Sequence, residues 1–355
     1  MAIYTQRWRL SHFGCVVFLV AGMPVTFSPT ALWAQSLTLE RQQIQSSIDG
    51  LRCGQTSAGA SAIRALIQSG KPVIPDVAPL LNDTDPNTRV AALTVLGQVG
   101  ASQLVNEISG KLSDTDARVR AAAAEALGRL ADKQATAAVL GALDDPDRLV
   151  RMNAMASVAV LDAQAAVPSL LESSRRKSLT DEERQASILS LGQLRATAAA
   201  PDLRVILTDQ AENDRTRAAA AAALGVIGDK SAIRPLVAVL GQGSSALRFH
   251  TVGSLGRLGG PDAERELIRV LRNTGEEDFV RIRAAWGLGD IRTDTAIQAL
   301  LAMAQEGPEF IAMQAVRVLV LKDIPQGHAA ALALKARSQD PFVATTLDDL
   351  LAGQR

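Results

Sequence analysis

A leucine that recurs at a nearly constant spacing is the feature that most restricts how this chain can fold. We call its positions the markers, and successive markers lie 31 or 33 residues apart. They are Leu96, Leu127, Val158, Leu191, Leu224, Leu255, Leu288, Leu319 and Leu350. A period of this length, kept over nine occurrences, is typical of a repeat array in which each unit packs on its neighbours.

Other residue types keep fixed distances from the markers. Four residues before a marker the side chain is small, as at Ala123, and glycine directly follows six of the markers, as at Gly128. A glycine inside a helix costs about 1 kcal/mol relative to alanine, so we expect these small residues to let neighbouring helices approach closely. Seven residues before the markers stands a column of arginines, for which we predict a structural ladder along the stack rather than a ligand site. They are Arg89, Arg120, Arg151, Arg184, Arg217, Arg248 and Arg281.

Each period divides into two helices joined by an acidic turn, as in "DDPD" at residues 144–147. Asp85, Asp116 and Asp147 stand four residues before column arginines, where we expect their side chains to cap the second helix of the pair. A helical pair of this size cannot bury its apolar face alone and must stack on further pairs. The sequence therefore predicts an all-α fold, a right-handed α-solenoid of stacked helical hairpins.

The pattern D-x-D-x-x-V-R-x-A-A-A-x-A-L-G-x-L, from Asp114 to Leu130, resembles the HEAT-like repeats of phycobilisome lyase subunits. The resemblance covers residues 73–355, about nine repeats, and implies the repeat fold but no particular activity. Residues 35–72 resemble a degenerate helical pair. We expect this pair to form the N-terminal cap that such arrays need.

Residues 1–34 have a different composition from the rest of the chain. Arg7 and Arg9 precede an apolar run, and small residues precede Ala34. This order is typical of a secretory signal peptide, with cleavage expected after Ala34. Leu32 fits the cleavage pattern less well than alanine, so an uncleaved membrane anchor stays the alternative. We expect an exported protein, periplasmic or extracellular, that touches a membrane only if this segment is uncleaved.

Composition and motifs limit the chemistry that we expect of the exported chain. Removal of residues 1–34 leaves two more acidic than basic side chains, which gives no reason to expect nucleic acid as a partner. Cys53 is then the only cysteine, so it has no internal disulfide partner. We expect a small buried or capped thiol, and pairing between molecules is the alternative. HEAT-like iron hydroxylases depend on His-Glu pairs, and no such pair occurs here. We predict no catalytic, cofactor-binding or metal-binding residue, and hence a protein that is not an enzyme.

The aromatic residues that follow residue 34 all lie in the late repeats, beginning at Phe249. If the second helices line the concave face, helical geometry places the positions 9, 6 and 2 before a marker and 2 after it on the outward stripe. Aromatic, apolar and arginine side chains on such a stripe are typical of protein interfaces. The candidate partner-binding residues are Phe249, Arg257, Phe279, Ile282, Trp286, Phe310, Met313 and Arg317. The alternative is that the rings fill gaps in the late repeats.

We therefore hypothesise an exported, non-enzymatic scaffold that binds a protein or peptide on its concave face. A ligand-handling or lyase-like accessory protein is the alternative that the resemblance to phycobilisome lyase subunits implies. A purely structural role in an assembly is a third possibility. The charged segment at residues 172–184 is expected to be a solvated turn and helix start.

Overall fold

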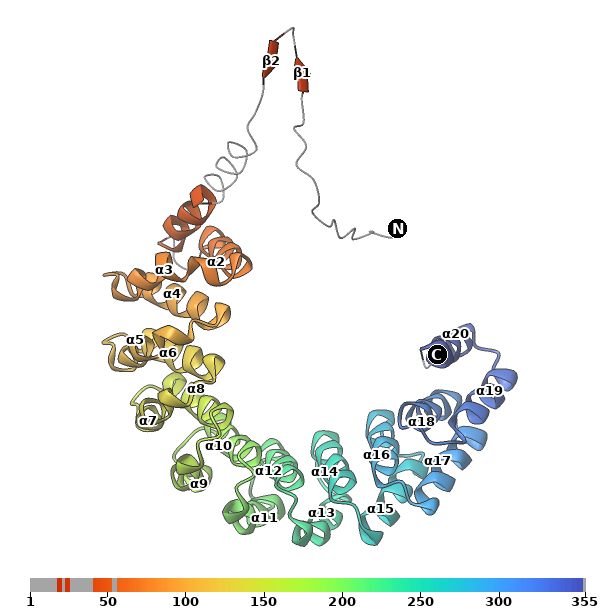
Figure 1. Ribbon diagram of the computed structural model, residues 1–355. Helices are drawn as coiled ribbons and strands as arrows, with labels where there is room; N and C mark the ends of the chain where they lie inside the picture. The colour runs from red at the N-terminus through yellow and green to blue at the C-terminus, as the bar shows by residue number, and fades with distance from the viewer. Residues whose placement is uncertain (1–17, 21–22, 26–40, 53–55, 354–355) are drawn as a thin grey trace. The chain divides into compact units, whose positions relative to one another are not determined.

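The computed structural model describes residues 18–20, 23–25, 41–52 and 56–353, and the chain forms two compact units, residues 1–101 and 102–355 (Figure 1). The predicted signal peptide lies outside the described residues except for two short strands, and Cys53 also lies outside them. The predicted domain limits at residues 34 and 72 stay predictions.

The first unit combines two strands with helices. Strand β1 (Phe18–Val20) pairs antiparallel with β2 (Met23–Val25), which is an exception to the all-α prediction. The chain is helical over residues 41–51 and then forms α2 (Ser57–Ser69), α3 (Ile74–Val77) and α4 (Pro86–Val99). Helix α4 contacts α2 and α3, and Leu66 and Leu96 are fully buried.

The second unit is a row of helical hairpins, which confirms the predicted α-solenoid of HEAT-like repeats. The first helices of the hairpins are α5 (Val105–Gly110), α7 (Thr136–Gly141), α9 (Val167–Arg175), α11 (Ala200–Thr208), α13 (Ile233–Val239), α15 (Pro261–Arg272), α17 (Asp294–Glu306) and α19 (Gly327–Arg337). The second helices are α6 (Ala117–Leu130), α8 (Arg148–Val160), α10 (Asp181–Gln193), α12 (Asp214–Ile227), α14 (Ser245–Leu258), α16 (Asp278–Ile291), α18 (Glu309–Leu321) and α20 (Pro341–Ala352).

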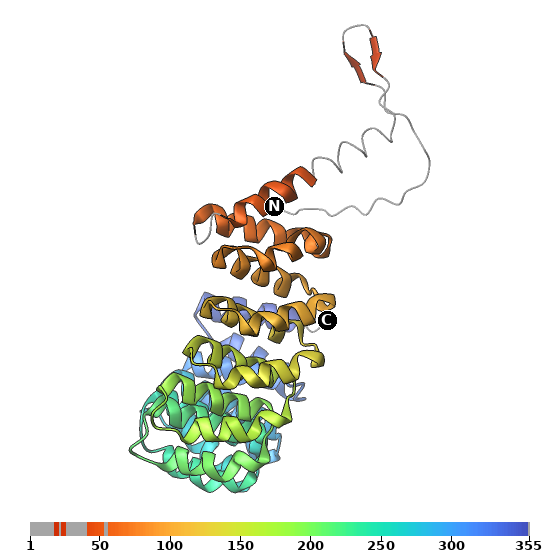
Figure 2. The same cartoon turned by 90° about the vertical axis from the view of Figure 1, so that its left-hand side faces the viewer.

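Short 3₁₀ turns extend or precede many first helices. They are η1 (Lys71–Val73), η2 (Ala78–Asn82), η3 (Ser102–Leu104), η4 (Lys111–Ser113), η5 (Lys133–Ala135), η6 (Ala142–Asp144), η7 (Gln164–Ala166), η8 (Thr197–Ala199) and η9 (Lys230–Ala232). In the second unit the second helices from α6 to α18 lie on the inner, concave side of the row (Figure 1), and the helices stack side by side (Figure 2). Across the described part of the chain, every helix is too short or too polar to cross a membrane.

The core of the array lies between successive second helices, as the marker pattern predicts. Leu127, Leu224 and Leu288 are fully buried, and so are the small residues four positions before them. Asp116 and Asp147 cap the N-termini of α6 and α8 by accepting hydrogen bonds from backbone N–H groups of the first turn. The apolar stripe and the cap together explain why α6 and α8 begin and pack where they do.

Glycine after the marker allows very close helix contacts. A Cβ atom on Gly256 would lie 2.6 Å from the Cα atom of Gly287 in the next second helix, and one on Gly192 would lie 2.9 Å from the Cα atom of Ala223. At other interfaces, where a serine faces the glycine, the serine also ties neighbouring second helices together. The Ser254 hydroxyl, for example, donates to the Ala221 carbonyl at 2.7 Å. The close approach therefore gains hydrogen bonds as well as dispersion contacts.

The arginine column lies at the turns between the helices, where several members bridge consecutive repeats. Arg120 donates to Asp145, Arg184 donates to Glu212, and Arg151 and Arg248 make the same kind of pair with Glu183 and Glu276. Arg217 and Arg281 instead pair with an aspartate in their own helical turn, Asp214 and Asp278. Arg89 donates to the Asp83 carbonyl, 2.8 Å away.

Candidate binding groove on the concave face

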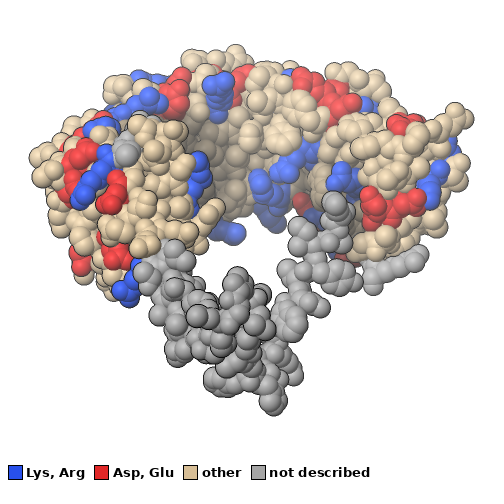
Figure 3. Space-filling model, turned by 90° about the horizontal axis from the view of Figure 1, so that it is seen from above, with Lys and Arg blue, Asp and Glu red and all other residues tan. Residues whose placement is uncertain are grey.

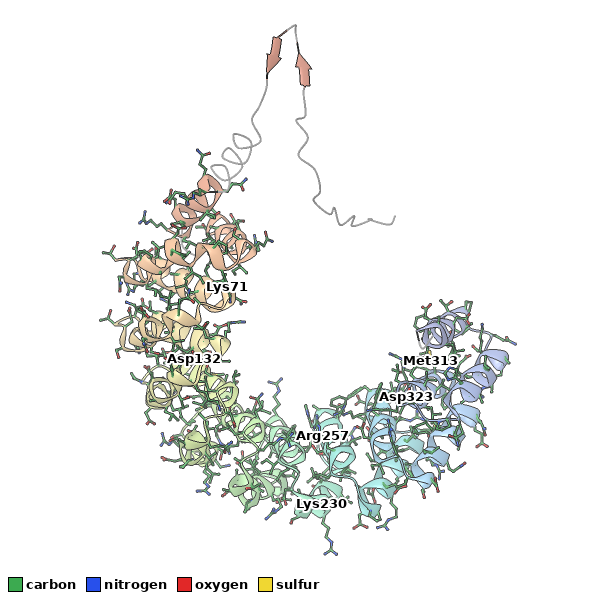
Figure 4. All side chains as sticks on the ribbon, in the orientation of Figure 1. Lys71, Asp132, Lys230, Arg257, Met313 and Asp323 are labelled. Atoms are coloured by element: carbon green, nitrogen blue, oxygen red, sulfur yellow. The ribbon has the colours of Figure 1, made fainter. Side chains whose placement is uncertain are left out.

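The candidate interface residues of the sequence differ in their exposure. Phe279 and Phe310 are 44% and 49% exposed. Arg257 is also exposed, and Figure 4 shows it directed toward the hollow side of the array. The remaining candidates except Met313 are half-buried: Phe249, Ile282, Trp286 and Arg317.

Met313 is not an interface residue, because it is only 2% exposed. It belongs to α18, which contacts α16, α17, α19 and α20. A helix surrounded in this way buries apolar residues on more than one face, and Val316 and Val320 are buried as well. The prediction for Met313 was wrong because the stripe of α18 is exposed at Phe310 but closed at Met313.

The structure brings some of the remaining candidates together and separates others. The rings of Phe249 on α14 and Phe279 on α16 lie 5.8 Å apart between centroids. Trp286 lies apart from this pair, with the Lys322 ammonium 5.7 Å from its ring centroid. Arg317 donates to the Gln314 side chain at 3.2 Å.

Phe249 and Arg257 line a groove of about 380 Å³ on the concave face. The floor is made of small residues, among them Gly192 on α10 and Ala223 on α12. Four consecutive second helices, α10, α12, α14 and α16, contribute to this groove. The remaining lining residues are Leu189, Gln193, Ala222, Val226, His250 and Arg283.

Arg283, on α16, lies across the neighbouring helix α14. Its guanidinium carbon lies 5.4 Å from the centroid of the Phe249 ring, a cation–π arrangement. A Cβ atom on Gly253 would come within 2.5 Å of the Arg283 Nε atom and 2.6 Å of Nη2. Gly253 therefore provides the space that the guanidinium occupies, and a residue with a side chain there would displace it.

The groove contains two arginines that form no ion pair with the described acidic side chains. Among the described residues, neither Arg257 nor Arg283 has an acidic side chain within ion-pair distance, and the Nε atom of Arg283 is buried without a hydrogen-bond partner. Burial and, next, the charge of Arg257 lower the pKa of Arg283, and the charge of Asp290 acts in the opposite direction. Burial and the charges of Arg283 and Arg257 also lower the pKa of His250, so this imidazole is neutral at pH 7. Figure 3 shows basic side chains on the hollow face of the array.

The sequence pattern did not identify Arg283, His250 or Gly253 as site residues. Arg283 and His250 stand five residues before their markers, outside the stripe assigned to the concave face. Gly253 stands on the stripe, but it is not one of the aromatic, apolar or arginine residues by which interface candidates were selected. The signal lay in the pairing of a glycine on one helix with an arginine 30 residues later, which becomes visible only when the two repeats are aligned against each other.

The charged segment at residues 172–184 is fixed by local and cross-repeat pairing. Thr180 and Glu183 form a capping box at the start of α10. Lys177 and Arg184 both pair with Glu212, and the side chains of Arg184 and Glu212 are almost fully buried. Residues 175–182 are mostly exposed, as predicted for a solvated turn and helix start, whereas Glu183 and Arg184 at the end of the segment are buried. Among the residues that the structure describes, no group of three His, Cys, Asp or Glu side chains is arranged to hold a metal ion.

Comparisons with known proteins identify the repeat type. The HEAT repeats family matches residues 104–180, 174–248 and 233–320, more than half of the chain. A chain of the Kap95–Nup1 complex has a similar fold, with a TM-score of 0.66, 14% identity, and coverage of 92% of this chain and 51% of that one. The complex of CpcE and CpcF of phycocyanin lyase from Nostoc sp. PCC7120 gives a TM-score of 0.45 at 21% identity, covering 70% of this chain and 94% of that one.

A curated relative corrects one prediction. Deoxyhypusine hydroxylase-B of Oryza sativa subsp. japonica is 36% identical over 116 residues, which are 33% of this chain and 38% of the rice protein. The chain thus spans less than two fifths of that enzyme's length. The prediction of a protein that is not an enzyme was wrong in light of this relative. The absence of a known motif is a poor argument here, because a catalytic and a non-catalytic array share the same packing pattern.

Proposed function

Because the chain belongs to the HEAT repeat family, whose stacked hairpins present an extended concave surface, we propose that it binds a protein or peptide segment in the groove formed by α10, α12, α14 and α16. The protein acts after export, in the periplasm or outside the cell. The signal-peptide pattern of residues 1–34 supports this location.

The observation that carries the proposal is the meeting of aromatic rings and unpaired arginines at one groove. Phe279 is 44% exposed beside Phe249, and Arg257 and Arg283 stand next to them without acidic partners among the described residues. Exposed rings cost free energy in water, and aromatic residues and arginine dominate the hot spots of protein interfaces. A partner that covers the rings and neutralises the arginines removes both costs.

The first experiment is a pull-down from the exported fraction with the full chain and three variants. Phe249→Ala/Phe279→Ala removes the ring that lines the groove and the exposed ring beside it. Trp286→Ala/Arg317→Ala removes two candidate residues that do not line the groove. Phe342→Ala is the matched control, because Phe342 is 64% exposed on α20 and does not line the groove. All proteins are first compared for helicity by circular dichroism and for Tm.

A partner held by the wild type and the Phe342 variant, and lost from the folded Phe249/Phe279 variant, supports binding at the groove. Retention by that variant, with loss from the Trp286/Arg317 variant, would move the site to α16 and α18. An empty pull-down from the exported fraction would contradict the proposal. Fractionation of cells that carry a C-terminally tagged chain tests the export step separately.

A catalytic or ligand-handling role is the second candidate, and the similarity to the rice hydroxylase over 116 residues is the observation in its favour. An absorption spectrum, an intact-mass spectrum and elemental analysis of the purified protein test this role directly. A stoichiometric metal or bound small molecule would support it. Clean apo-protein in all three measurements would argue against it.

A further inference from the structure

The groove has a chemical preference that follows from what surrounds its two arginines. Arg257 is exposed at the rim, whereas Arg283 is half-buried between Phe249 and Gly253. The other lining residues of the groove are apolar or neutral, with Gln193 and His250 as the polar ones. The array otherwise pairs many of its arginines with acidic side chains, as Arg248 on the same helix pairs with Glu276. Both arginines that line the groove therefore differ from the paired arginines in having no ion pair.

We propose that the groove recognises an acidic segment of a partner protein, with carboxylate side chains bound by Arg257 and Arg283 and an adjacent apolar or aromatic side chain covering Phe249 and Phe279. This inference rests on the proposed function, which it deepens by naming the chemistry of the partner.

Arginine favours a carboxylate partner for geometric reasons. Its planar guanidinium donates two parallel hydrogen bonds to the two oxygens of a carboxylate, and such charge-assisted bonds are about twice as strong as neutral ones. Partial burial of Arg283 strengthens the attraction, because less water screens the pair. The floor of the groove is made of small residues, of which Ala222 is half-buried, so no long side chain fills the space above it.

The same groove is a poor match for a nucleic acid. Nucleic-acid surfaces track a run of phosphates with a basic stripe, and the whole chain has equal numbers of basic and acidic side chains. Two arginines within a mainly apolar lining suit two or three carboxylates better than a long polyanion.

Gly253 is a positioning residue in this scheme. With alanine at this position, a new Cβ atom would fall 2.5 Å from Arg283 Nε and would push the guanidinium off α14. The helix itself should tolerate the change, because alanine is a better helix former than glycine. Gly253→Ala therefore tests the placement of Arg283 without removing its charge.

The experiment measures binding to the full chain by fluorescence anisotropy with three labelled peptides of equal length. The first contains glutamate and phenylalanine, the second has glutamine in place of glutamate, and the third has lysine. We expect the acidic peptide to bind at least about tenfold more tightly than the other two, the lower limit for a hydrogen bond to a charged group. The preference should weaken as salt is raised.

Variants locate the effect. Arg257→Ala and Arg283→Ala should each weaken the acidic peptide by about tenfold or more. Arg234→Ala is the matched control, because Arg234 is exposed on the outer helix α13 and has no ion pair among the described residues; it should change affinity by less than about twofold. Arg257→Glu/Arg283→Glu should favour the lysine peptide. Gly253→Ala, if folded with wild-type Tm or better, should weaken the acidic peptide as Arg283→Ala does.

Several outcomes would overturn the inference while the proposed function stands. One is equal binding of the acidic and glutamine peptides, with loss only in Phe249→Ala. Another is an unchanged affinity in both arginine variants, and a third is capture of a protein in the pull-down without binding of any acidic peptide. Preferential binding of a single-stranded oligonucleotide would overturn the acidic-segment assignment as well. If no peptide binds and the pull-down is empty, both proposals fail together.

Discussion

The buried pair of Arg184 and Glu212 offers the sharpest test of how the array is held together. Arg184 Nη1 and Nη2 donate to the two carboxylate oxygens of Glu212 at 2.8 and 2.7 Å. The two side chains are 4% and 5% exposed. The pair connects the start of α10 to the turn before α12, and Lys177 adds a second cation from the solvent side.

Glu212→Gln keeps the shape of the side chain but removes its charge. Arg184 then stays buried without its main partner, with only the exposed Asp181 carboxylate 3.8 Å away, and the loss of one partner of a buried pair costs about 3–5 kcal/mol. We expect the lower part of this range, because Lys177 is 63% exposed and water can reach the edge of the site. In a unit of this size 3 kcal/mol corresponds to a fall in Tm of about 6–12 °C.

The effect should be local, because each repeat contacts only its neighbours. Urea unfolding followed by circular dichroism measures the loss of stability, and hydrogen exchange should show the earliest opening at α9 to α12. The control is Glu266→Gln, because Glu266 pairs with Arg269 at 2.7 Å on the surface, where a pair is worth at most about 1 kcal/mol. A Glu212→Gln protein within about 1 kcal/mol of the wild type would refute the reasoning.

Three further predictions concern the packing and charge of single residues. Ala131→Gly should stabilise the protein by about 0.5–1 kcal/mol in urea unfolding, because Ala131 has a φ of +53°. The steric cost of this left-handed conformation for alanine exceeds the extra conformational entropy that glycine loses on folding. A destabilised variant would contradict this. Gly256→Ala should lose about 1–2 kcal/mol, because the new Cβ would lie 2.6 Å from Gly287 Cα and overpacking outweighs the gain in helix propensity. A higher Tm would show that the helices separate freely. Arg120 holds the pKa of Asp145 below its usual value, so the pair stabilises the fold above about pH 4 and this contribution is lost as the pH falls further. Asp145→Asn should flatten the loss of stability between about pH 5 and 2, and an unchanged slope would exclude the pair as its source.

The repeat architecture was predictable because every repeat satisfies the same local and nearest-neighbour requirements. The marker Leu127 is fully buried, and Asp116 caps α6 where its distance from Arg120 predicts a cap. These features depend on residues within one helix or on the identical helix one period away. A single sequence contains both kinds of information, because the period itself aligns the neighbours.

Features that depend on the ends of the array or on one particular pair of repeats were less predictable. Met313 is buried, whereas Ile282 at the same position of the preceding repeat is half-buried. Helices α16 and α18 each contact four helices, so the period does not distinguish the two positions. The left-handed conformation after the second helices is a second example. It occurs at Gly228 but also at Ala131, Arg195 and Arg292, so packing imposes it where the residue type does not favour it.

The candidate groove depends on the close packing of second helices that forms the whole array. The interface between α14 and α16 differs from two earlier ones in the residue that faces the glycine. At two earlier interfaces a serine, Ser157 or Ser254, faces the glycine of the preceding second helix and donates across to a carbonyl. Between α14 and α16 the facing residue is Gly287, without a hydroxyl, and glycine meets glycine. The two backbones approach closely at this point, and one helical turn away the next glycine, Gly253, receives the guanidinium of Arg283. Because Gly253 has no side chain, the guanidinium of Arg283 lies across α14 beside the ring of Phe249. It forms no ion pair with an acidic side chain of the described chain. A purely structural change would have no need to leave that charge unpaired, which is the physical reason to expect a ligand there.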